Sequence, residues 1–109
     1  MKFEVFQSEN NEKHYFRLKA QNGQVILSSQ GYAGKDGCEG GIESVRKNAM
    51  DDAMFERKES ENGKFFFNLK AGNGQIIGSS QMYTTKAAME KGIESVKNAA
   101  PQAVIATVK

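Results

Sequence analysis

One stretch of this chain is written twice, and the duplication constrains the fold more than any other feature. The first copy runs from Phe16 to Ala49, and the second runs from Phe67 to Ala100. The copies are about 51 residues apart, and roughly 20 aligned positions are identical. A unit of about 50 residues buries too little surface to be stable alone. We therefore expect one pseudo-twofold domain over residues 1–109, with the repeats meeting near residues 52 and 53.

The composition excludes several classes of protein. Of the 109 residues, 39% are hydrophobic and 26% are charged, as in ordinary globular domains. A net charge of +2 is too small to indicate nucleic-acid or membrane binding by itself. The single cysteine, Cys38, excludes an intramolecular disulfide and a cysteine-rich metal site. The chain shows no apolar run of signal-peptide or transmembrane length, so we expect a cytoplasmic protein without membrane contact.

The first part of each copy has the pattern of a β-hairpin. Phe16, Leu18 and Ala20 alternate with polar residues, which predicts a strand with one buried face. Asn22-Gly23 and Asn73-Gly74 predict hairpin turns of type I′, in which both central residues have positive φ. A short apolar run precedes each hairpin, at residues 3–6 and from residue 55, and predicts a further strand.

The second part of each copy has the spacing of a helix. Apolar residues recur at helical intervals in both copies: Cys38, Ile42, Val45 and Ala49, then Met89, Ile93, Val96 and Ala100. Gly41 and Gly92 border these stripes, so we expect each helix to approach the sheet closely there.

Other residues indicate where the helices begin and end. Asp36, followed by Glu39, resembles a capping box, and Thr84 or Thr85 is a suitable N-cap for the second helix. Pro101 ends that helix, and the β-rich residues 103–108 predict a final strand.

Each unit is therefore predicted to contain three strands and a helix, followed by a further strand. The strand after the second helix needs a sheet edge with which to pair. One antiparallel sheet with both helices on one face would satisfy that strand and bury both apolar stripes. The expected fold class is α+β, with two tandem β(3)-α-β repeats sharing one sheet.

A long motif, NGQ-x-I-x-SSQ-x-Y-x-x-K followed by GIESV, occurs in both copies. In this the chain resembles the YegP-like family of small bacterial proteins of uncharacterised function, over nearly its whole length. The resemblance implies a single sheet in which the C-terminal strands are swapped between repeats. It also implies a monomer that imitates a dimer of single-repeat chains. It implies no catalytic or binding residues.

The first copy departs from the usual pattern of this family. Gly34, Gly37 and Gly40 occupy positions where the second copy has better helix formers. Glycine disfavours helix, so we expect the first helix to start later and fray more than the second.

The sequence shows no arrangement typical of an enzyme. His14 is the only histidine, and neither a second histidine nor a cysteine lies near it in the sequence. A nucleophile–base pair or a zinc site needs such partners. Cys38 lies on the apolar stripe where the second copy has Met89, which favours a packing role. We therefore expect no enzymatic activity, no cofactor and no metal.

The repeated Ser-Ser-Gln-x-Tyr string forms one candidate site in each copy. It brings hydroxyl, amide and lysine groups to a corner between a strand and a helix start, which suits an anion. The alternative is that these groups bond the local backbone and cap the helix, and we favour it. The candidate corner residues are Ser29, Gln30, Tyr32 and Lys35, and Ser80, Gln81, Tyr83 and Lys86.

The sheet face left open by the helices is the other candidate site. Its predicted residues are Tyr15, Arg17, Lys19, Phe66, Asn68 and Lys70. Basic and aromatic side chains on a sheet can bind single-stranded nucleic acid, although they also occur on ordinary solvated strands. An exposed Phe66 would indicate a contact surface for a protein partner or for self-association.

Three functions follow from these observations. The leading prediction is a small non-enzymatic binding or interaction module. The alternatives are a nucleic-acid-binding accessory protein that uses the open face, and a binder of small anions or metabolites at the strand-to-helix corners.

Overall fold

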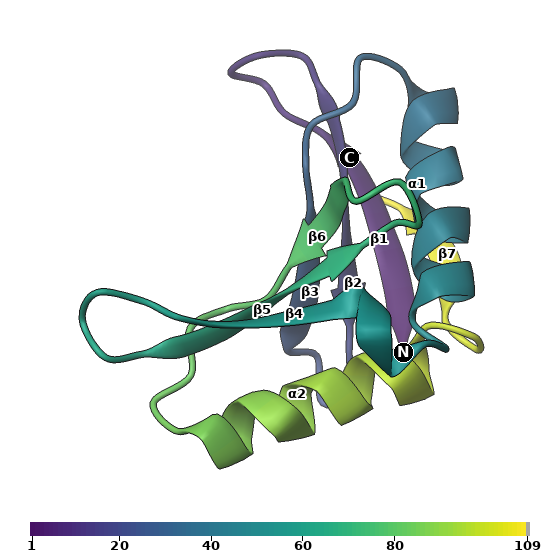
Figure 1. The fold of residues 1–109 in the computed structure, drawn as a ribbon. Helices are drawn as coiled ribbons and strands as arrows, with labels where there is room; N and C mark the ends of the chain where they lie inside the picture. The colour runs from purple at the N-terminus through teal and green to yellow at the C-terminus, as the bar shows by residue number, and fades with distance from the viewer. Residues whose placement is uncertain (109) are drawn as a thin grey trace.

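The computed structural model describes residues 1–108 and contains seven strands and two α-helices (Figure 1). In chain order the elements are β1 Lys2–Gln7, β2 His14–Lys19, β3 Val25–Ser29, α1 Lys35–Asn48, a 3-10 turn Asp52–Met54, β4 Phe55–Glu59, β5 Phe65–Lys70, β6 Ile76–Ser79, α2 Lys86–Ala99 and β7 Val104–Thr107. No helix within residues 1–108 is both long and apolar enough to cross a membrane.

The seven strands form one sheet in the order β4-β5-β6-β3-β2-β1-β7. The C-terminal strand of the second repeat therefore pairs with the first strand of the first repeat, which confirms the predicted swap for this strand. The strand after α1, β4, pairs only with β5 within residues 1–108, so the swap is not reciprocal. Every pairing is antiparallel except that of β7 with β1. The sheet is therefore mixed and not wholly antiparallel as expected. The cause is that α2 delivers the chain to the start of β1, where Val104 lies opposite Lys2.

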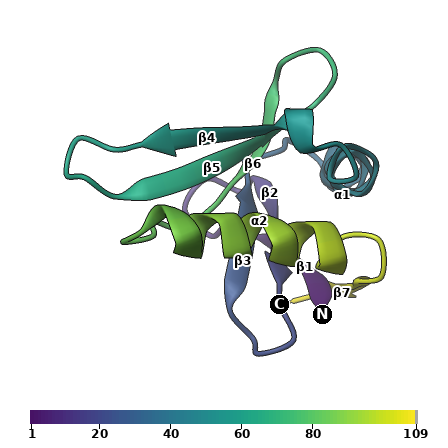
Figure 2. The same ribbon diagram turned by 60° about the horizontal axis from the view of Figure 1, so that its bottom comes forward.

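Both helices lie on the same side of the strongly curved sheet (Figures 1 and 2). Each helix contacts strands of both repeats: α1 packs on β2, β5 and β6, and α2 packs on β5, β2 and β3. The buried residues of the two repeats form one cluster, with Phe3, Phe16 and Phe67 among its largest members. The alternation predicted for the strands is confirmed, since Phe16 and Leu18 are buried and Arg17 between them is not.

The two hairpin turns differ from the type I′ prediction. The Gly23 N–H donates to the Ala20 carbonyl, and the Ala20 N–H donates to the Gln24 carbonyl, both at 2.9 Å. Only the glycine has positive φ, at 84°, whereas type I′ requires it at Asn22 also. The turn is therefore a three-residue loop with glycine in the left-handed region, and the type I′ prediction is wrong. Asn22 instead accepts a hydrogen bond from the Gln24 N–H, at 3.0 Å.

The first helix does not start later than the second. α1 begins at Lys35 and α2 at Lys86, which are equivalent positions, and each helix has 14 residues. Thr85 caps α2 as predicted, since its hydroxyl accepts from the Ala88 N–H at 3.0 Å. The capping box predicted at Asp36 is wrong, because Asp36 lies inside the first turn. The N-cap of α1 is Gly34, which makes no side-chain cap hydrogen bond, and greater fraying of α1 stays a prediction.

A backbone bridge immediately before each helix explains the equal starts. The His14 N–H donates to the Tyr32 carbonyl at 2.7 Å, and the Tyr32 N–H donates back at 2.8 Å. Phe65 and Tyr83 form the same bridge in the second repeat. These bonds hold the chain at the same place in both repeats, whatever the cap residue is.

Gly41 and Gly92 allow the close helix approach that the sequence predicted. A Cβ at Gly41 would overlap the Tyr32 hydroxyl, and a Cβ at Gly92 would overlap that of Tyr83. The Tyr32 ring is stacked on Phe16, with centroids 6.2 Å apart. Each tyrosine therefore lies between its strand and a glycine on its helix.

The two helices hold the repeats together through reciprocal contacts. Arg46 of α1 donates to the carbonyl of Ala103, which follows α2, at 2.7 Å. Lys97 of α2 pairs with Asp52, which follows α1, also at 2.7 Å. Both cations also lie over aromatic rings, Arg46 over Phe3 and Lys97 over Phe55. Each helix thus fixes the connection that leaves the other helix.

The strands that meet at the pseudo-twofold axis carry unlike residues at equivalent positions. β3 and β6 pair through Ser28 with Ser79 and Ser29 with Gly78. Leu27 is fully buried, and its Cγ would lie 2.8 Å from a Cβ placed on Gly78. Gly78 is the repeat equivalent of Leu27, so one copy supplies the side chain and the other supplies the space.

We expect the substitution Gly41→Ala to lower the free energy of unfolding by about 1–3 kcal/mol, because its methyl group would overlap Tyr32. The neighbouring Gly40 has no atom within 4 Å of a Cβ position. Gly40→Ala should therefore raise stability by up to about 1 kcal/mol through helix propensity. Urea unfolding of both variants is the measurement, and equal effects would contradict the packing described for Gly41.

Deleting residues 103–109 should destabilise the whole domain. The deletion removes the strand paired with β1 and the carbonyl that Arg46 binds, and it leaves β1 as an open edge. We expect the melting temperature to fall by at least about 10 °C. An unchanged melting temperature would show that the swapped strand is not part of the folded core.

Candidate functional site

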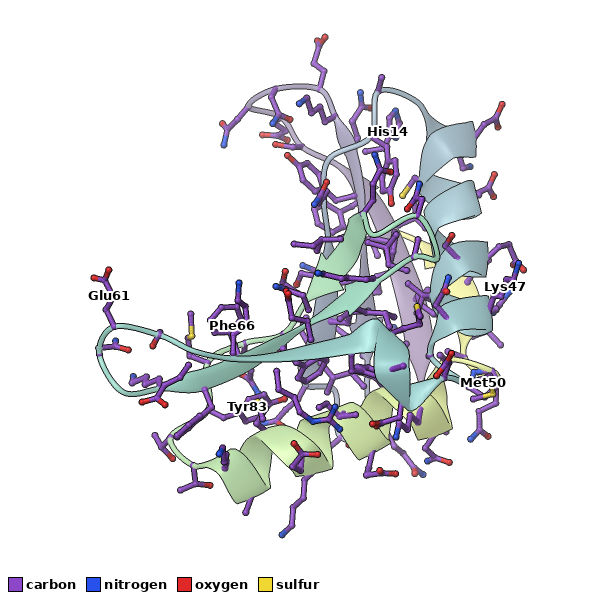
Figure 3. The ribbon with its side chains drawn as sticks, viewed as in Figure 1. His14, Lys47, Met50, Glu61, Phe66 and Tyr83 are labelled. Atoms are coloured by element: carbon purple, nitrogen blue, oxygen red, sulfur yellow. The ribbon has the colours of Figure 1, made fainter. Side chains whose placement is uncertain are left out.

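The six residues predicted for the open sheet face all lie on the face away from the helices. They form two groups of three, one on β2 and one on β5, with β3 and β6 between the two strands. Figure 3 shows Phe66 and Tyr83 on opposite sides of the β4–β5 hairpin, with Tyr83 on the side of α2. The strand alternation was therefore sufficient to predict which residues share this face.

A buried carboxylate that the sequence reasoning missed organises the β2 group. Glu4 Oε1 lies 2.7 Å from Arg17 Nε and 3.2 Å from Lys19 Nζ, and Lys2 Nζ lies 3.4 Å from its other oxygen. The Glu4 side chain is 7% exposed. The hydrogen bond from Arg17 is the main cause that lowers the pKa of Glu4 from 4.5 to about 2, against the opposing effect of burial. The sequence predicted a strand over residues 3–6 but not its register, so it did not place Glu4 opposite Arg17.

Glu56 is the equivalent carboxylate of the β5 group. Lys70 lies 2.9 Å from it, and the Asn68 amide donates to it at 3.1 Å. The hydrogen bond from Lys70 is the main cause that lowers the pKa of Glu56. Asn68 also accepts from the Ser79 hydroxyl, at 2.6 Å. These contacts bury Asn68, so this residue is part of the face but not exposed, contrary to expectation.

Aromatic side chains lie at the outer end of each group. Phe6 and Tyr15 are stacked, with centroids 5.8 Å apart and planes inclined by 18°, and the Arg17 guanidinium lies 4.7 Å from the Phe6 centroid. Phe66 occupies the place equivalent to Tyr15 and is half-buried, not fully exposed as expected. The face therefore presents aromatic surface next to basic groups.

The serines and tyrosines at the corners have structural partners. The Ser29 hydroxyl accepts from the Phe16 N–H and donates to the Gln30 carbonyl, both at 2.9 Å. Ser80 makes the same two bonds to Phe67 and Gln81. Tyr32 and Tyr83 fill the space above the helix glycines. These contacts support the structural alternative, while Gln30, Gln81, Lys35 and Lys86 are exposed.

The single cysteine of the chain belongs to the hydrophobic core. Cys38 is fully buried, and burial is the main cause that raises the pKa of its thiol to about 11. Its thiol therefore stays protonated near neutral pH. Within residues 1–108, no three His, Cys, Asp or Glu side chains are grouped so as to hold a metal ion.

Comparison with known proteins identifies the family. Residues 9–56 and 60–106 each match the family described as "Domain of unknown function (DUF1508)". The chain belongs to this family. A UPF0339 protein in the 5′ region of a ptx operon of Stutzerimonas stutzeri is 57% identical, over 97% of this chain and 95% of that protein. The UPF0339 protein YegP of Escherichia coli K12 is 53% identical, over 87% of this chain and 86% of its own length.

Two solved structures confirm the fold. The solution NMR structure of yegP from E. coli, described as a protein of unknown function, superposes with a TM-score of 0.92 at 46% identity, and covers 97% of this chain and 90% of that one. A UPF0339 protein from Shewanella oneidensis gives 0.91 at 44% identity, and covers 97% and 89%. The expected family membership is therefore confirmed, and the names of these relatives indicate no specific function.

The buried Glu4 predicts a pH dependence of stability. Its pKa is lower in the folded state, so its stabilising effect is complete above about pH 4.5 and is lost as the pH falls towards about 2. Glu4→Gln should flatten this part of the stability curve, measured by urea unfolding at several acidic pH values. Glu61→Gln, in the exposed β4–β5 turn, is the control. A slope that Glu4→Gln leaves unchanged would show that another group causes the acid sensitivity.

Proposed function

We propose that the protein is a non-enzymatic binding module whose open sheet face binds an acidic segment of a partner protein. The main observation that supports this proposal is the excess positive charge on this face. Its strands carry five basic side chains against two carboxylates: Lys2, Arg17, Lys19, Lys58 and Lys70 against Glu4 and Glu56. The excess positive charge lies beside the half-buried aromatic rings of Phe6, Tyr15 and Phe66.

The two carboxylates have a role in this proposal. Each holds its cations extended along the sheet surface, so that less side-chain entropy is lost when a partner binds. Lys58 lies 3.9 Å from Glu56 and its side chain is 49% exposed, which leaves this cation available to an acidic group. Charge complementarity of this kind mainly gives specificity and fast association.

We further infer that the module acts as a monomer in the cytoplasm. The reciprocal contacts of Arg46 and Lys97 hold the two repeats together within one chain. Two single-repeat chains would have to dimerise to form the same contacts. The buried free cysteine fits a reducing compartment.

Single-stranded nucleic acid is the second candidate partner. The stack of Arg17 on Phe6 and of Phe6 on Tyr15 is the observation that favours it, because flat rings next to cations suit a base and its phosphate. If nucleic acid is the partner, its affinity should fall steeply as the salt concentration rises, since phosphate contacts release counterions.

An amide NMR titration distinguishes the two candidates. The probes are a glutamate-rich peptide and a short single-stranded oligonucleotide, each added at low and at moderate salt. We expect the peptide to shift the amides of Arg17, Lys58, Phe66 and Lys70. Lys58→Glu should weaken its binding about fivefold, whereas Lys91→Glu, on the exposed side of α2, should leave it unchanged.

Two other outcomes would change the conclusion. Tighter binding of the oligonucleotide to the same amides, with a steep salt dependence, would replace the protein partner by nucleic acid. If neither probe shifts these amides at millimolar concentration, the open face is not a contact surface and the proposal fails.

A further inference from the structure

The structure contains two equivalent wedge-shaped spaces, each between the first turn of a helix and the end of its repeat's hairpin. The first wedge has a cavity volume of about 380 Å³ and is lined by residues that include Val5, His14, Lys35, Thr107 and Val108. The second has a volume of about 130 Å³ and is lined by Arg57, Phe65, Lys86 and Met89 among others. Figure 3 shows His14 beside the start of α1.

The strand registers establish that these wedges correspond residue by residue. Val5 pairs with Phe16 in β2, and Arg57 pairs with the equivalent Phe67 in β5. By the same register, His14 corresponds to Phe65. Lys35 and Lys86 are the first residues of the two helices. The paired strands and the helix starts therefore correspond in the two wedges, and the difference in volume comes from other features.

Side chains close the second wedge and leave the first one open. Arg57 crosses the second wedge to Glu90 on α2, with Nε 2.6 Å from the carboxylate. Val5 cannot make this contact, and Glu39, the counterpart of Glu90, has no ion pair within residues 1–108. Phe65 is likewise replaced by the smaller and polar His14.

The swapped strand supplies a wall that only the first wedge has. Thr107 and Val108 line the first cavity, and the Val108 N–H donates to the Val5 carbonyl at 2.8 Å. The chain that leaves α1 passes through the 3-10 turn Asp52–Met54 and becomes β4 itself, so no strand within residues 1–108 pairs with the outer edge of β4. The first wedge is therefore larger and also enclosed on a further side.

The lining of the first wedge combines an apolar wall with a cationic group. Val5 and Val108 supply the apolar surface, and Lys35 has no ion pair with any residue in the described chain. The imidazole of His14 supplies a further polar group, and Glu9, which is exposed, also lines the cavity. Ligand pockets of roughly 300–1,000 Å³ with mostly apolar walls and a few polar groups are typical small-molecule sites.

We propose that the first wedge binds a small organic anion, with its charged head at Lys35 and a short apolar body against Val5 and Val108. This site differs from the open sheet face in its charged group, Lys35, although Phe6 borders both. The second wedge, already closed by Arg57, does not bind the same ligand.

The test uses hexanoate and hexyl phosphate as probes, with hexanol as the neutral comparison, in amide NMR titrations of the full chain. We expect saturable shifts at Gln7, His14, Lys35 and Thr107 with an anionic probe, and none at Arg57, Phe65 and Lys86. The anion that binds more tightly shows whether the site prefers a carboxylate or a phosphate head group.

Matched variants separate the pocket from general charge effects. Lys35→Ala should lower the affinity for the tighter-binding anion about tenfold through loss of a charge-assisted contact. Lys86→Ala at the second wedge should leave this affinity unchanged. His14→Phe copies the residue that the second repeat tolerates and should also weaken binding by filling the cavity. The proposal is overturned if neither anion gives saturable shifts at millimolar concentration. It is also overturned if hexanol binds equally well, or if Lys35→Ala and Lys86→Ala act alike.

Discussion

Neither repeat of this protein can bury its own helix without the strands of the other. The apolar stripe of α1 covers β5 and β6 as well as β2, and α2 covers β2 and β3 as well as β5. Arg46 and Lys97 then fix the connections that leave the opposite helices. Burial by two crossed helices is non-directional, whereas these two polar contacts are directional, so together they define both the core and the relative orientation of the repeats. The open face, the first wedge and the swapped strand all depend on that orientation.

Most of the fold could be predicted from the sequence, because the repeat doubles each local signal. Alternation around Phe16 and Phe67, the helical stripes and the β-rich tail were sufficient for the element order, and the family resemblance implied the swap. The parallel direction of β7 was not predictable, since it depends on the place where α2 delivers the chain. The start of α1 was mispredicted for a related reason, since the local preference at Asp36 competes with the backbone bridge between His14 and Tyr32. The turn type was mispredicted for a local reason, because the loop has three residues and Asn22 accepts a hydrogen bond from the Gln24 N–H.

The candidate sites could likewise be predicted from the sequence only in part. Period-two alternation placed six residues on one face, but it did not reveal that Glu4 is buried beneath three cations, because this requires the register between strands. Lys35 and Lys86 were predicted as corner residues, but the rest of each wedge was missed because the comparison needs a shift of one residue: Val5 corresponds to Arg57 only after the shorter β4–β5 turn is taken into account. A single sequence shows which residues are shared by two repeats, whereas the difference in volume between the two wedges comes from residues that are not shared.

The pair formed by Leu27 and Gly78 has a consequence for how such a chain can change over evolution. In a dimer of identical single repeats, both sides of the axis must carry the same residue, and two leucines would collide there while two glycines would leave a void. Fusion of the repeats removes this restriction and permits a large residue to face a small one. Once that has happened, neither half can return to pairing with a copy of itself. The two repeats are then distinct components, each of which fits only the other.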